Sequence, residues 1–258
     1  MAVHLKEERL RVILDAIQSS GRVTVSELSR DLDVSPVTVR RDLHDLATQG
    51  LVQRAHGGAL PALASAAPEP PVLLRMSDNA SDKARIGRAA AALIPDNSSV
   101  FIGSGTTTVQ VARHLITRRN LTVVTNALNV AFELATTEGI TVVVAGGLMR
   151  SSELSLIGHI AEQSLREVRV DRVVIGIPAV SLEAGLTNEY LPEVMTDRHI
   201  IDMAPELIVV ADHTKFGKVA SAFIAPVARI KTLVTDPHAD PETLARLRQL
   251  GIRVVVAE

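Results

Sequence analysis

The chain has 258 residues, 47% of them hydrophobic, which is enough for one large or two smaller domains with buried cores. Its formal net charge is −2, and the absence of cysteine excludes disulfides, thiolate nucleophiles and cysteine-ligated zinc. No apolar run approaches the roughly 20 residues that cross a bilayer, and the first residues lack the apolar core of a signal peptide. We therefore expect a cytoplasmic protein without a membrane partner.

The first 60 residues show three helical patterns. Apolar residues recur at helical spacing at Leu10, Ile13, Leu14 and Ile17, and Gly21 follows as a stop signal. Thr24 stands three residues before Glu27, which is the spacing of a capping box. Ser35 followed by Pro36 predicts an N-cap and a first-turn proline for the next helix. Two short helices with a tight connection between them predict a helix-turn-helix.

The third helix separates its residues by face. On a helical wheel, one side holds Val37, Arg40, Arg41, His44 and Thr48. The opposite side holds Val39, Leu43 and Leu46, and Asp42 and Asp45 stand on the flank. Residues 1–60 contain eight Lys/Arg and eight Asp/Glu, so a basic surface here must come from arrangement rather than excess.

Such a helix suits a DNA major groove, since arginine can bind guanine edges or phosphates. An arginine pair alone also fits an ordinary solvated helix face. The following segment GLVQRAHGGAL predicts two short strands with a glycine-rich turn, a wing that carries Arg54 and His56. The capped helix before the pair and the wing after it favour double-stranded DNA as the partner.

A proline- and alanine-rich linker is predicted over residues 61–74, between a domain at 1–60 and a second at 75–258. The second domain alternates short β-branched runs with helix-compatible segments. This pattern predicts an α/β fold with a parallel sheet covered on both faces. Its strands are expected at 99–103, 121–125, 140–146, 172–177, 207–212, 230–235 and 252–257.

Polar loops follow several of these strands. Residues Gly103 to Thr108 pass from a strand into a helix, where backbone amides and hydroxyls form an anion site. A tight strand-to-helix turn capped by threonine would look the same. Because carboxyl ends of parallel strands meet at one edge, we expect one ligand site there. Its expected members are Ser104, Gly105, Thr106, Thr107, Thr108, Asn126, Gly146, Gly147, Asp212 and Lys215.

The run VSPVTVRRDLHDL followed by RAHGGA resembles the winged helix-turn-helix of the DeoR family of bacterial transcription regulators. The resemblance implies DNA contacts at Ser35, Thr38, Arg40, Arg41 and His56. Wheel and wing positions add Val37, His44 and Arg54 to the expected DNA-binding set.

The second domain resembles the DeoR-family effector domain, whose fold is similar to ribose-5-phosphate isomerases. The segments TNALNVA and AGGLMRSSE are nearest to regulators of the glycerol-3-phosphate type. The chain departs from the family pattern at Gly103, where aspartate is common, and at Ile177-Pro178-Ala179, where glycines are common. In EYLPEVMTDRHII, Glu193 and Arg198 are either pocket residues or part of a solvated helix face.

These observations predict a homo-oligomeric repressor of a carbohydrate operon, controlled by a phosphorylated sugar or similar metabolite. No cofactor, catalytic residue or metal ligand is expected, since His159 and His199 lack metal-ligand spacing. The alternative is a sugar-phosphate isomerase or aminosugar-phosphate deaminase with an accessory DNA-binding domain, in which Asp212 and Lys215 would transfer protons. A nucleotide-binding protein is a weaker alternative, because no lysine follows the second glycine of GSGTTT.

Overall fold

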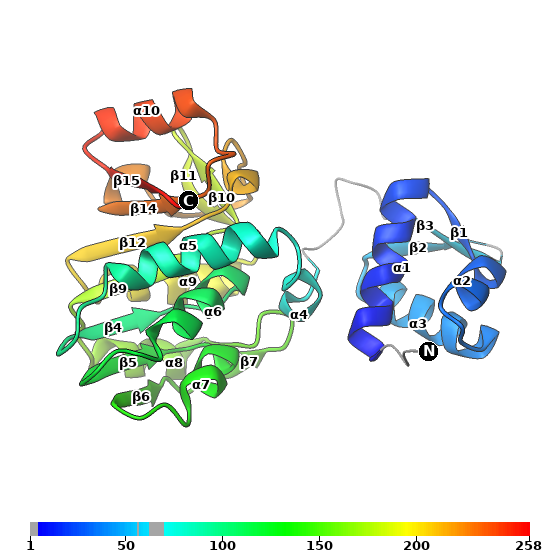
Figure 1. Cartoon of the computed structure of the whole chain (residues 1–258), viewed down its shortest axis with the longest axis horizontal. Helices are drawn as coiled ribbons and strands as arrows, with labels where there is room; N and C mark the ends of the chain where they lie inside the picture. Colours follow the sequence, from blue (N-terminus) through cyan, green and yellow to red (C-terminus); the bar gives the residue numbers. More distant parts are fainter. Residues whose placement is uncertain (1–4, 56, 62–69) are drawn as a thin grey trace. The chain divides into compact units, whose positions relative to one another are not determined.

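The computed structural model describes residues 5–55, 57–61 and 70–258 and divides them into two compact units (Figure 1). The first unit ends at Met76 and the second begins at Ser77. Each unit has its own hydrophobic core, and each is described separately below.

The first unit is a winged helix-turn-helix. Its elements are α1 (Lys6–Ser20), β1 (Val23–Thr24), α2 (Val25–Asp31), α3 (Pro36–Thr48), β2 (Val52–Ala55), β3 (Gly58–Pro61) and α4 (Val72–Arg75). The three strands form an antiparallel sheet in the order β1-β3-β2. The hairpin β2-β3 is the predicted wing, and the short β1 is an addition that the sequence pattern did not indicate.

The predicted helix boundaries are confirmed by their caps. The Thr24 hydroxyl accepts a hydrogen bond from the Glu27 amide while the Glu27 carboxylate accepts one from the Thr24 amide. The Ser35 hydroxyl accepts from the Thr38 amide at 3.1 Å and so starts α3 at Pro36. Gly21 ends α1 with φ of +69°, a left-handed conformation that glycine adopts without strain.

The core of the first unit contains the predicted apolar stripes. Val39, Leu43 and Leu46 are completely buried on the inner side of α3. Asp42 was predicted on the flank of the helix, but the structure buries it, with only 1% of the residue exposed. It lies against the Arg9 guanidinium of α1, whose Nη2 is 3.0 Å from Asp42 Oδ1. Helix α3 is thus held by an ion pair as well as by apolar packing.

The second unit is an α/β domain with a parallel sheet in the order β15-β14-β12-β9-β4-β5-β6. Its strands are β4 (Ser99–Ile102), β5 (Leu121–Thr125), β6 (Ile140–Val144), β9 (Arg172–Gly176), β12 (Glu206–Val210), β14 (Thr232–Thr235) and β15 (Arg253–Val256). All seven predicted strands are present, and their ladders are parallel.

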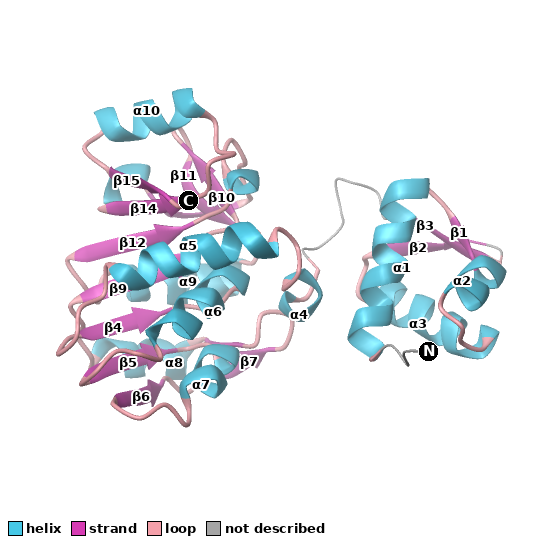
Figure 2. Ribbon diagram, in the orientation of Figure 1, coloured by secondary structure: helices cyan, strands magenta, loops and turns pink. Residues whose placement is uncertain are grey.

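Helices cover both faces of this sheet (Figure 2). The helices are α5 (Ala80–Ala92), α6 (Thr106–Leu115), α7 (Leu128–Leu134), α8 (His159–Arg166), α9 (Leu191–Ile201) and α10 (Pro241–Gln249), with 3-10 turns η1 (His213–Lys215) and η2 (Val227–Arg229). Helices α5, α6 and α7 lie in front of the sheet in this view, and α8 and α9 lie behind it. The β-branched strand residues are buried between these layers.

Two smaller sheets accompany the main one and were not predicted. The hairpin β7 (Leu148–Arg150) and β8 (Ser155–Ile157) follows β6. The strands β10 (Ala179–Ser181), β11 (Gly185–Asn188) and β13 (Ala222–Ala225) form an antiparallel sheet. Strands of three or four residues are too short for a clear alternation of polar and apolar residues.

The structure differs at both ends from the linker predicted over 61–74. Pro61 belongs to β3, and residues 72–75 form α4, whose Leu74 joins the core of the first unit. Residues 62–69 lie outside the described part of the chain. Among the described helices, none is both long and apolar enough to cross a membrane.

The Arg9–Asp42 pair predicts that two carboxylates of α3, Asp42 and Asp45, contribute unequally to the stability of the first unit. Asp42→Ala should lower the free energy of unfolding of the first unit by about 3–5 kcal/mol, because the Arg9 side chain, 12% exposed, loses its ion pair with a buried carboxylate. Asp45→Ala should cost no more than about 1 kcal/mol, because its partner Lys6 is half exposed. Hydrogen exchange of the α3 amides in the full chain measures both effects. Equal loss of protection in the two variants would contradict this assignment.

Candidate functional site

The outer face of α3 presents the side chains that the helical wheel placed there. Val37 is 71% exposed, and Arg40, Arg41, His44 and Thr48 are also exposed. Ser35 and Thr38 lie at the start of this face, where their hydroxyl oxygens are 2.9 Å apart. The first turn of α3 therefore offers hydroxyls, and the next turn offers two guanidinium groups.

The carboxylates of α3 are neutralised from α1. Asp42 is paired with Arg9, and Asp45 Oδ2 lies 2.7 Å from Lys6 Nζ. The hydrogen bond from Lys6 holds the pKa of the Asp45 carboxyl below its ordinary value. Because both acids have cationic partners on α1, they offset little of the positive field of Arg40 and Arg41. The first unit therefore presents a basic helix face although it contains no excess of basic residues.

The wing carries Arg54 on β2, where its side chain is exposed and its backbone pairs with Ala59. Gly58 on β3 allows β1 to approach, since a Cβ there would lie 1.9 Å from the Val23 carbonyl oxygen. His56, the other predicted wing contact, lies outside the described residues.

The residues predicted for the ligand site follow the carboxyl ends of β4, β5, β6 and β12. After β4, Gly105 adopts φ of +130° and precedes α6, which begins at Thr106. Thr106, Thr107 and Thr108 form the first turn of α6, where backbone amides have no helical partner. This turn is the element at the edge best built for an anion.

Asn126 stands beside this turn, at the end of the neighbouring strand β5. Its side-chain Nδ2 donates to the Leu156 backbone carbonyl at 3.1 Å, and its backbone carbonyl accepts from the Leu156 amide at 2.7 Å. The residue is 2% exposed, and Oδ1 has no hydrogen-bond partner among the described residues. A buried acceptor of this kind is costly unless a donor reaches it. Asn126 Oδ1 is therefore a buried acceptor without a donor among the described residues.

The structure spreads the other predicted members along the edge. Four strand spacings separate β6 from β12, which is about 19 Å at the usual spacing. Between the ends of β4 and β12 stands Ile177, an apolar residue that follows β9 and is buried. A small ligand bound at the turn after β4 would therefore contact Asn126 more readily than it would contact the residues after β6 and β12 together.

The flanking members have structural contacts of their own. A Cβ at Gly147 would lie 2.8 Å from the Ile157 carbonyl oxygen, so glycine is required for hairpin packing. Asp212 is buried, and its Oδ1 accepts hydrogen bonds from the amide and the hydroxyl of Thr214. Asp212 is thus the N-cap of η1. Lys215, at the end of η1, is partly buried. Gly146 is exposed after β6.

The departure at Gly103 has a packing cause. A Cβ at this position would lie 3.1 Å from Ile175 Cγ2 on the adjacent strand β9. The isoleucine therefore occupies the space that a side chain at 103 would need.

A buried polar network next to Asn126 was missed by the sequence reasoning, except for Glu193. The Glu193 carboxylate forms an ion pair with Arg150 and accepts from Ser155 Oγ at 2.8 Å and from Asn188 Nδ2 at 3.2 Å. Arg150 also stacks over Tyr190, 4.4 Å from the ring centre. Ser155 precedes Leu156, the partner of Asn126. These residues come from four elements, so no local sequence spacing predicts the network.

Arg198 is the other residue that the sequence analysis considered for the pocket. Its side chain is exposed and donates a hydrogen bond to the Phe223 carbonyl.

Asp197 belongs to the same network through Asn188, whose Nδ2 is 3.3 Å from Asp197 Oδ2. Burial, with a smaller contribution from the Glu193 charge, raises the pKa of the Asp197 carboxyl to about 8. The raised pKa favours the protonated form, in which this side chain lies near Glu193 without repulsion.

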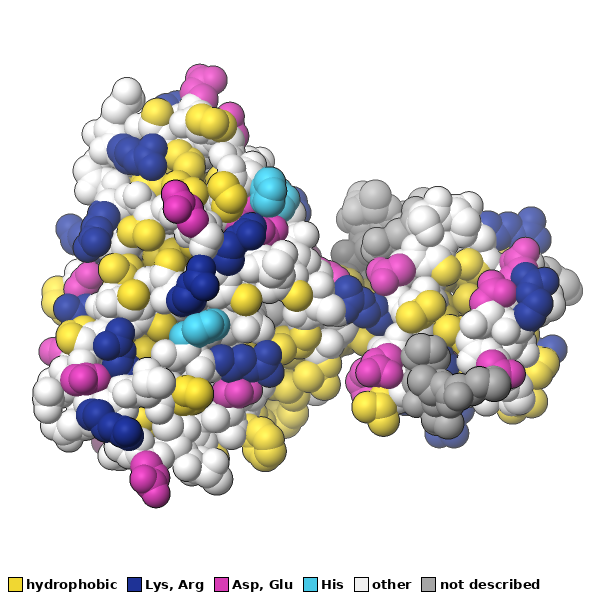
Figure 3. Space-filling view, in the orientation of Figure 1, with side chains coloured by type: hydrophobic (Ala, Val, Ile, Leu, Met, Phe, Trp, Pro, Cys, Tyr) yellow, Lys and Arg dark blue, Asp and Glu magenta, His cyan; other side chains and the backbone are white. Residues whose placement is uncertain are grey.

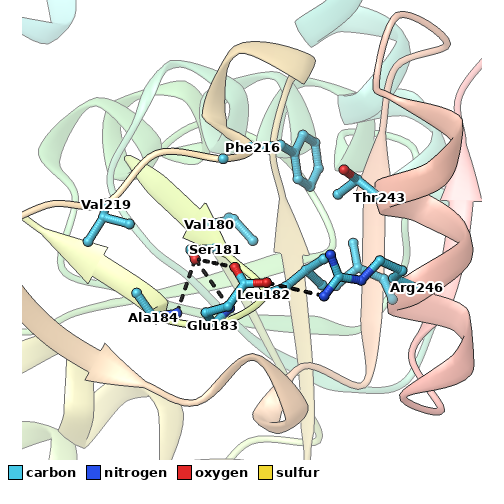
Figure 4. A pocket seen from close by; sticks show the side chains of 11 residues that line it. Val180, Ser181, Leu182, Glu183, Ala184, Phe216, Val219, Thr243 and Arg246 are labelled. Carbon is cyan, nitrogen blue, oxygen red and sulfur yellow. Dashed lines mark hydrogen bonds and ion pairs between the residues drawn. The ribbon is translucent and has the colours of Figure 1, made fainter.

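A cavity of about 440 Å³ lies elsewhere, between the β10-β11 turn, the segment after η1, and α10 (Figure 4). Glu183 and Arg246 face each other across it at 3.1 Å. The cavity contains none of the predicted ligand-binding residues, and Glu183 already neutralises its arginine. It is thus poorly suited to a phosphate.

Comparisons with known proteins agree with this architecture. The DeoR-like helix-turn-helix domain matches residues 9–62, and the DeoR C terminal sensor domain matches residues 78–237. The glycerol-3-phosphate regulon repressor of Escherichia coli (strain K12) is 36% identical over 229 residues, which cover 89% of this chain and 90% of that protein. The HTH-type transcriptional repressor CsqR of the same organism is 33% identical over 246 residues, covering 95% and 94%.

Two more distant similarities complete the comparison. The transcriptional repressor AccR of Agrobacterium fabrum is 30% identical over 237 residues and covers 92% of each chain. Among solved structures, ribose 5-phosphate isomerase A from Methanocaldococcus jannaschii is 18% identical, with a TM-score of 0.41 over 54% of this chain and 55% of that one.

A winged helix-turn-helix followed by a parallel-sheet sensor defines a DNA-binding transcription regulator. The chain belongs to the DeoR family.

Asp197 predicts a pH dependence of stability. Its pKa is about 8 in the folded chain against an ordinary 3.8, so its contribution to stability is present below about pH 3.8 and is lost as the pH rises towards 8. The melting temperature of the wild type should therefore fall between pH 6 and pH 9 more steeply than that of Asp197→Asn, which cannot ionise. Thermal unfolding across this range measures the difference. Parallel curves for the two proteins would contradict the raised pKa.

Proposed function

We propose that this DeoR-family regulator is a repressor of a carbohydrate operon, and that a phosphorylated sugar or similar metabolite changes its affinity for operator DNA. The observation that carries the DNA half is the outer face of α3, where Arg40 and Arg41 are exposed and the neighbouring acids are paired with α1. The names of its relatives, which include a glycerol-3-phosphate regulon repressor, support the class of metabolite.

Within this proposal, α3 enters the major groove and the wing lies near the backbone. The first turn, with Ser35, Val37 and Thr38, meets bases or phosphates, and Arg40, Arg41 and His44 extend the contact along the groove. Arg54 and His56 contact phosphates from the wing. Because Val37 is a large apolar side chain left 71% exposed, it is suited to contact a thymine methyl group.

The effector would lie at the β4 and β5 ends of the sheet. Its phosphate would take the amides and hydroxyls of Ser104 to Thr108 at the start of α6, and a sugar hydroxyl would donate to Asn126 Oδ1. Lys215 would reach the phosphate from the β12 side, while Gly146, Gly147 and Asp212 shape the flanking loops. The sensor would bind its metabolite without turning it over, since Asp212 is engaged as the cap of η1.

A homo-oligomer is part of the proposal, because one winged helix covers little DNA and paired half-sites multiply affinity. The second unit offers a surface for such contact at the β6 end of the sheet. Large apolar side chains are exposed there, namely Phe132, Val143, Val144, Leu148, Met149 and Ile160. Figure 3 shows hydrophobic side chains gathered near α7 and β7. Strand β6 also ends the sheet with an unpaired edge. Sedimentation equilibrium of the full chain tests this part.

The DNA proposal predicts the effect of removing either arginine. Arg40→Ala or Arg41→Ala should weaken operator binding by about 1–3 kcal/mol, roughly 5- to 150-fold, if the side chain binds a base. Arg248→Ala removes the same charge from α10 of the sensor and serves as the control. Fluorescence anisotropy with the cognate operator measures all three. Unchanged affinity in both α3 variants would remove α3 as the recognition helix.

The effector proposal predicts that Lys215→Ala keeps operator affinity but blunts the response. Losing a charged contact to a phosphate costs about 1.5–3 kcal/mol, so the metabolite concentration for half-maximal response should rise roughly 10- to 150-fold. Lys218→Ala, an exposed lysine three residues further on, is the matched control. Operator binding is titrated with phosphorylated sugars chosen by thermal-shift screening. A normal response in Lys215→Ala would place the phosphate elsewhere.

A further inference from the structure

Four potential metal ligands converge at the carboxyl ends of β12 and β14, separate from the turn assigned to the effector. They are Asp82 near the start of α5, His213 at the start of η1, Asp236 directly after β14, and His238 two residues later. One ligand atom from each residue lies within 4.8 Å of the other three. Asp82, His213 and the Asp236-His238 pair are far apart in the sequence, so no single spacing motif predicts the cluster.

The distances inside the cluster match a small tetrahedral site. His213 Nδ1 lies 3.1 Å from Asp236 Oδ1, and His238 Nδ1 lies 3.2 Å from the same oxygen and 3.7 Å from Asp82 Oδ1. In a tetrahedral zinc site with ligands at about 2.0–2.1 Å, neighbouring ligand atoms are about 3.3 Å apart. These three distances are within a few tenths of an ångström of that value, and the remaining distances between ligand atoms are at most 4.8 Å.

Hydrogen bonding alone serves this arrangement poorly. Asp236 Oδ1 accepts the backbone amide of His238 at 2.9 Å, while the two imidazole nitrogens approach it at 3.1 and 3.2 Å. One carboxylate oxygen has two lone pairs, fewer than the three nitrogens around it. A cation between the imidazoles and the carboxylates would take the nitrogen lone pairs directly and relieve this crowding.

We propose that Asp82, His213, Asp236 and His238 bind a divalent transition-metal ion, and that Zn²⁺ fits the donor set best. Two imidazole nitrogens with two carboxylate oxygens suit Zn²⁺, whereas Mg²⁺ and Ca²⁺ prefer oxygen ligands alone. The site is anchored by Asp236, which is completely buried, and is open to solvent at His238, whose side chain is 60% exposed. An ion can therefore enter without unfolding the sheet edge.

The charges around the cluster are compatible with a cation. Arg85 forms an ion pair with Asp82, which leaves the second carboxylate, Asp236, to balance the metal charge. A carboxylate has about four lone-pair positions, so Asp82 can hold the ion and Arg85 together. The edge-to-face packing of the two imidazoles, with ring centres 5.3 Å apart, leaves both nitrogens directed at Asp236.

A bound ion would join α5, η1 and the end of β14. Since η1 also carries Lys215, the ion would hold in place the loop that the proposed function assigns to the effector. The metal site itself rests only on the geometry of its four ligands. It is therefore tested by metal binding, with no operator or effector present.

The experiment uses the full chain, stripped with a chelator and then titrated with Zn²⁺ by calorimetry. We expect one strong site per chain, a higher melting temperature with Zn²⁺, and X-ray absorption showing nitrogen and oxygen ligands with imidazole at about 2.0–2.1 Å. His238→Ala should weaken binding at least about tenfold and abolish the thermal shift. Because the His238 side chain is exposed, its removal should leave the fold intact, and His213→Ala provides a second variant.

His159→Ala is the matched control, because this histidine is exposed on α8 and lies outside the cluster. It should bind Zn²⁺ as the wild type does. Equal Zn²⁺ affinity in the wild type and both cluster variants would overturn the proposal and leave the cluster as a hydrogen-bonded network. Tight binding of Mg²⁺ or Ca²⁺ without Zn²⁺ would overturn the assigned class of metal.

Discussion

The second unit depends on one constraint, the burial of its parallel sheet on both faces. The strands β12, β9, β4 and β5 are mostly apolar and lie between helices, and their charged residues, Arg172 and Glu206, stand at the first positions of β9 and β12. The chemistry is confined to the loops at the strand ends. The start of α6, Asn126, the network around Glu193 and the cluster around Asp236 all stand at or beside such ends. Because β12 and β6 are four spacings apart, one edge has room for more than one site.

In the first unit the decisive interactions run between α1 and α3. Arg9 and Lys6 neutralise Asp42 and Asp45, so the helix keeps acidic residues in its sequence without presenting their charge beside Arg40 and Arg41. The Arg9–Asp42 pair also helps to hold the orientation in which α3 packs against α1. A net charge near zero limits nonspecific attraction to phosphates, which leaves binding dependent on particular contacts.

Much of the fold could be predicted because its signals are local. Helix caps at Thr24 and Ser35 and the seven β-branched runs each act within a few residues, and the structure has them as expected. The strands β7, β8, β10, β11 and β13 were missed, because they are short and are held by partners distant in sequence. The ligand edge was predicted as one site, and the structure places its expected members along the ends of β4, β5, β6 and β12.

The sequence by itself determined the two kinds of domain, the exposed face of α3 and the glycine-containing turn before α6, since periodicity, capping and glycine placement need no distant partner. Only the tertiary structure decided that Asp42 is buried, that the pKa of Asp197 is raised, and that Asp82, His213, Asp236 and His238 meet. The physical reason is the same in each case. Burial and charge pairing depend on which elements pack together, and that packing brings together residues up to 156 positions apart.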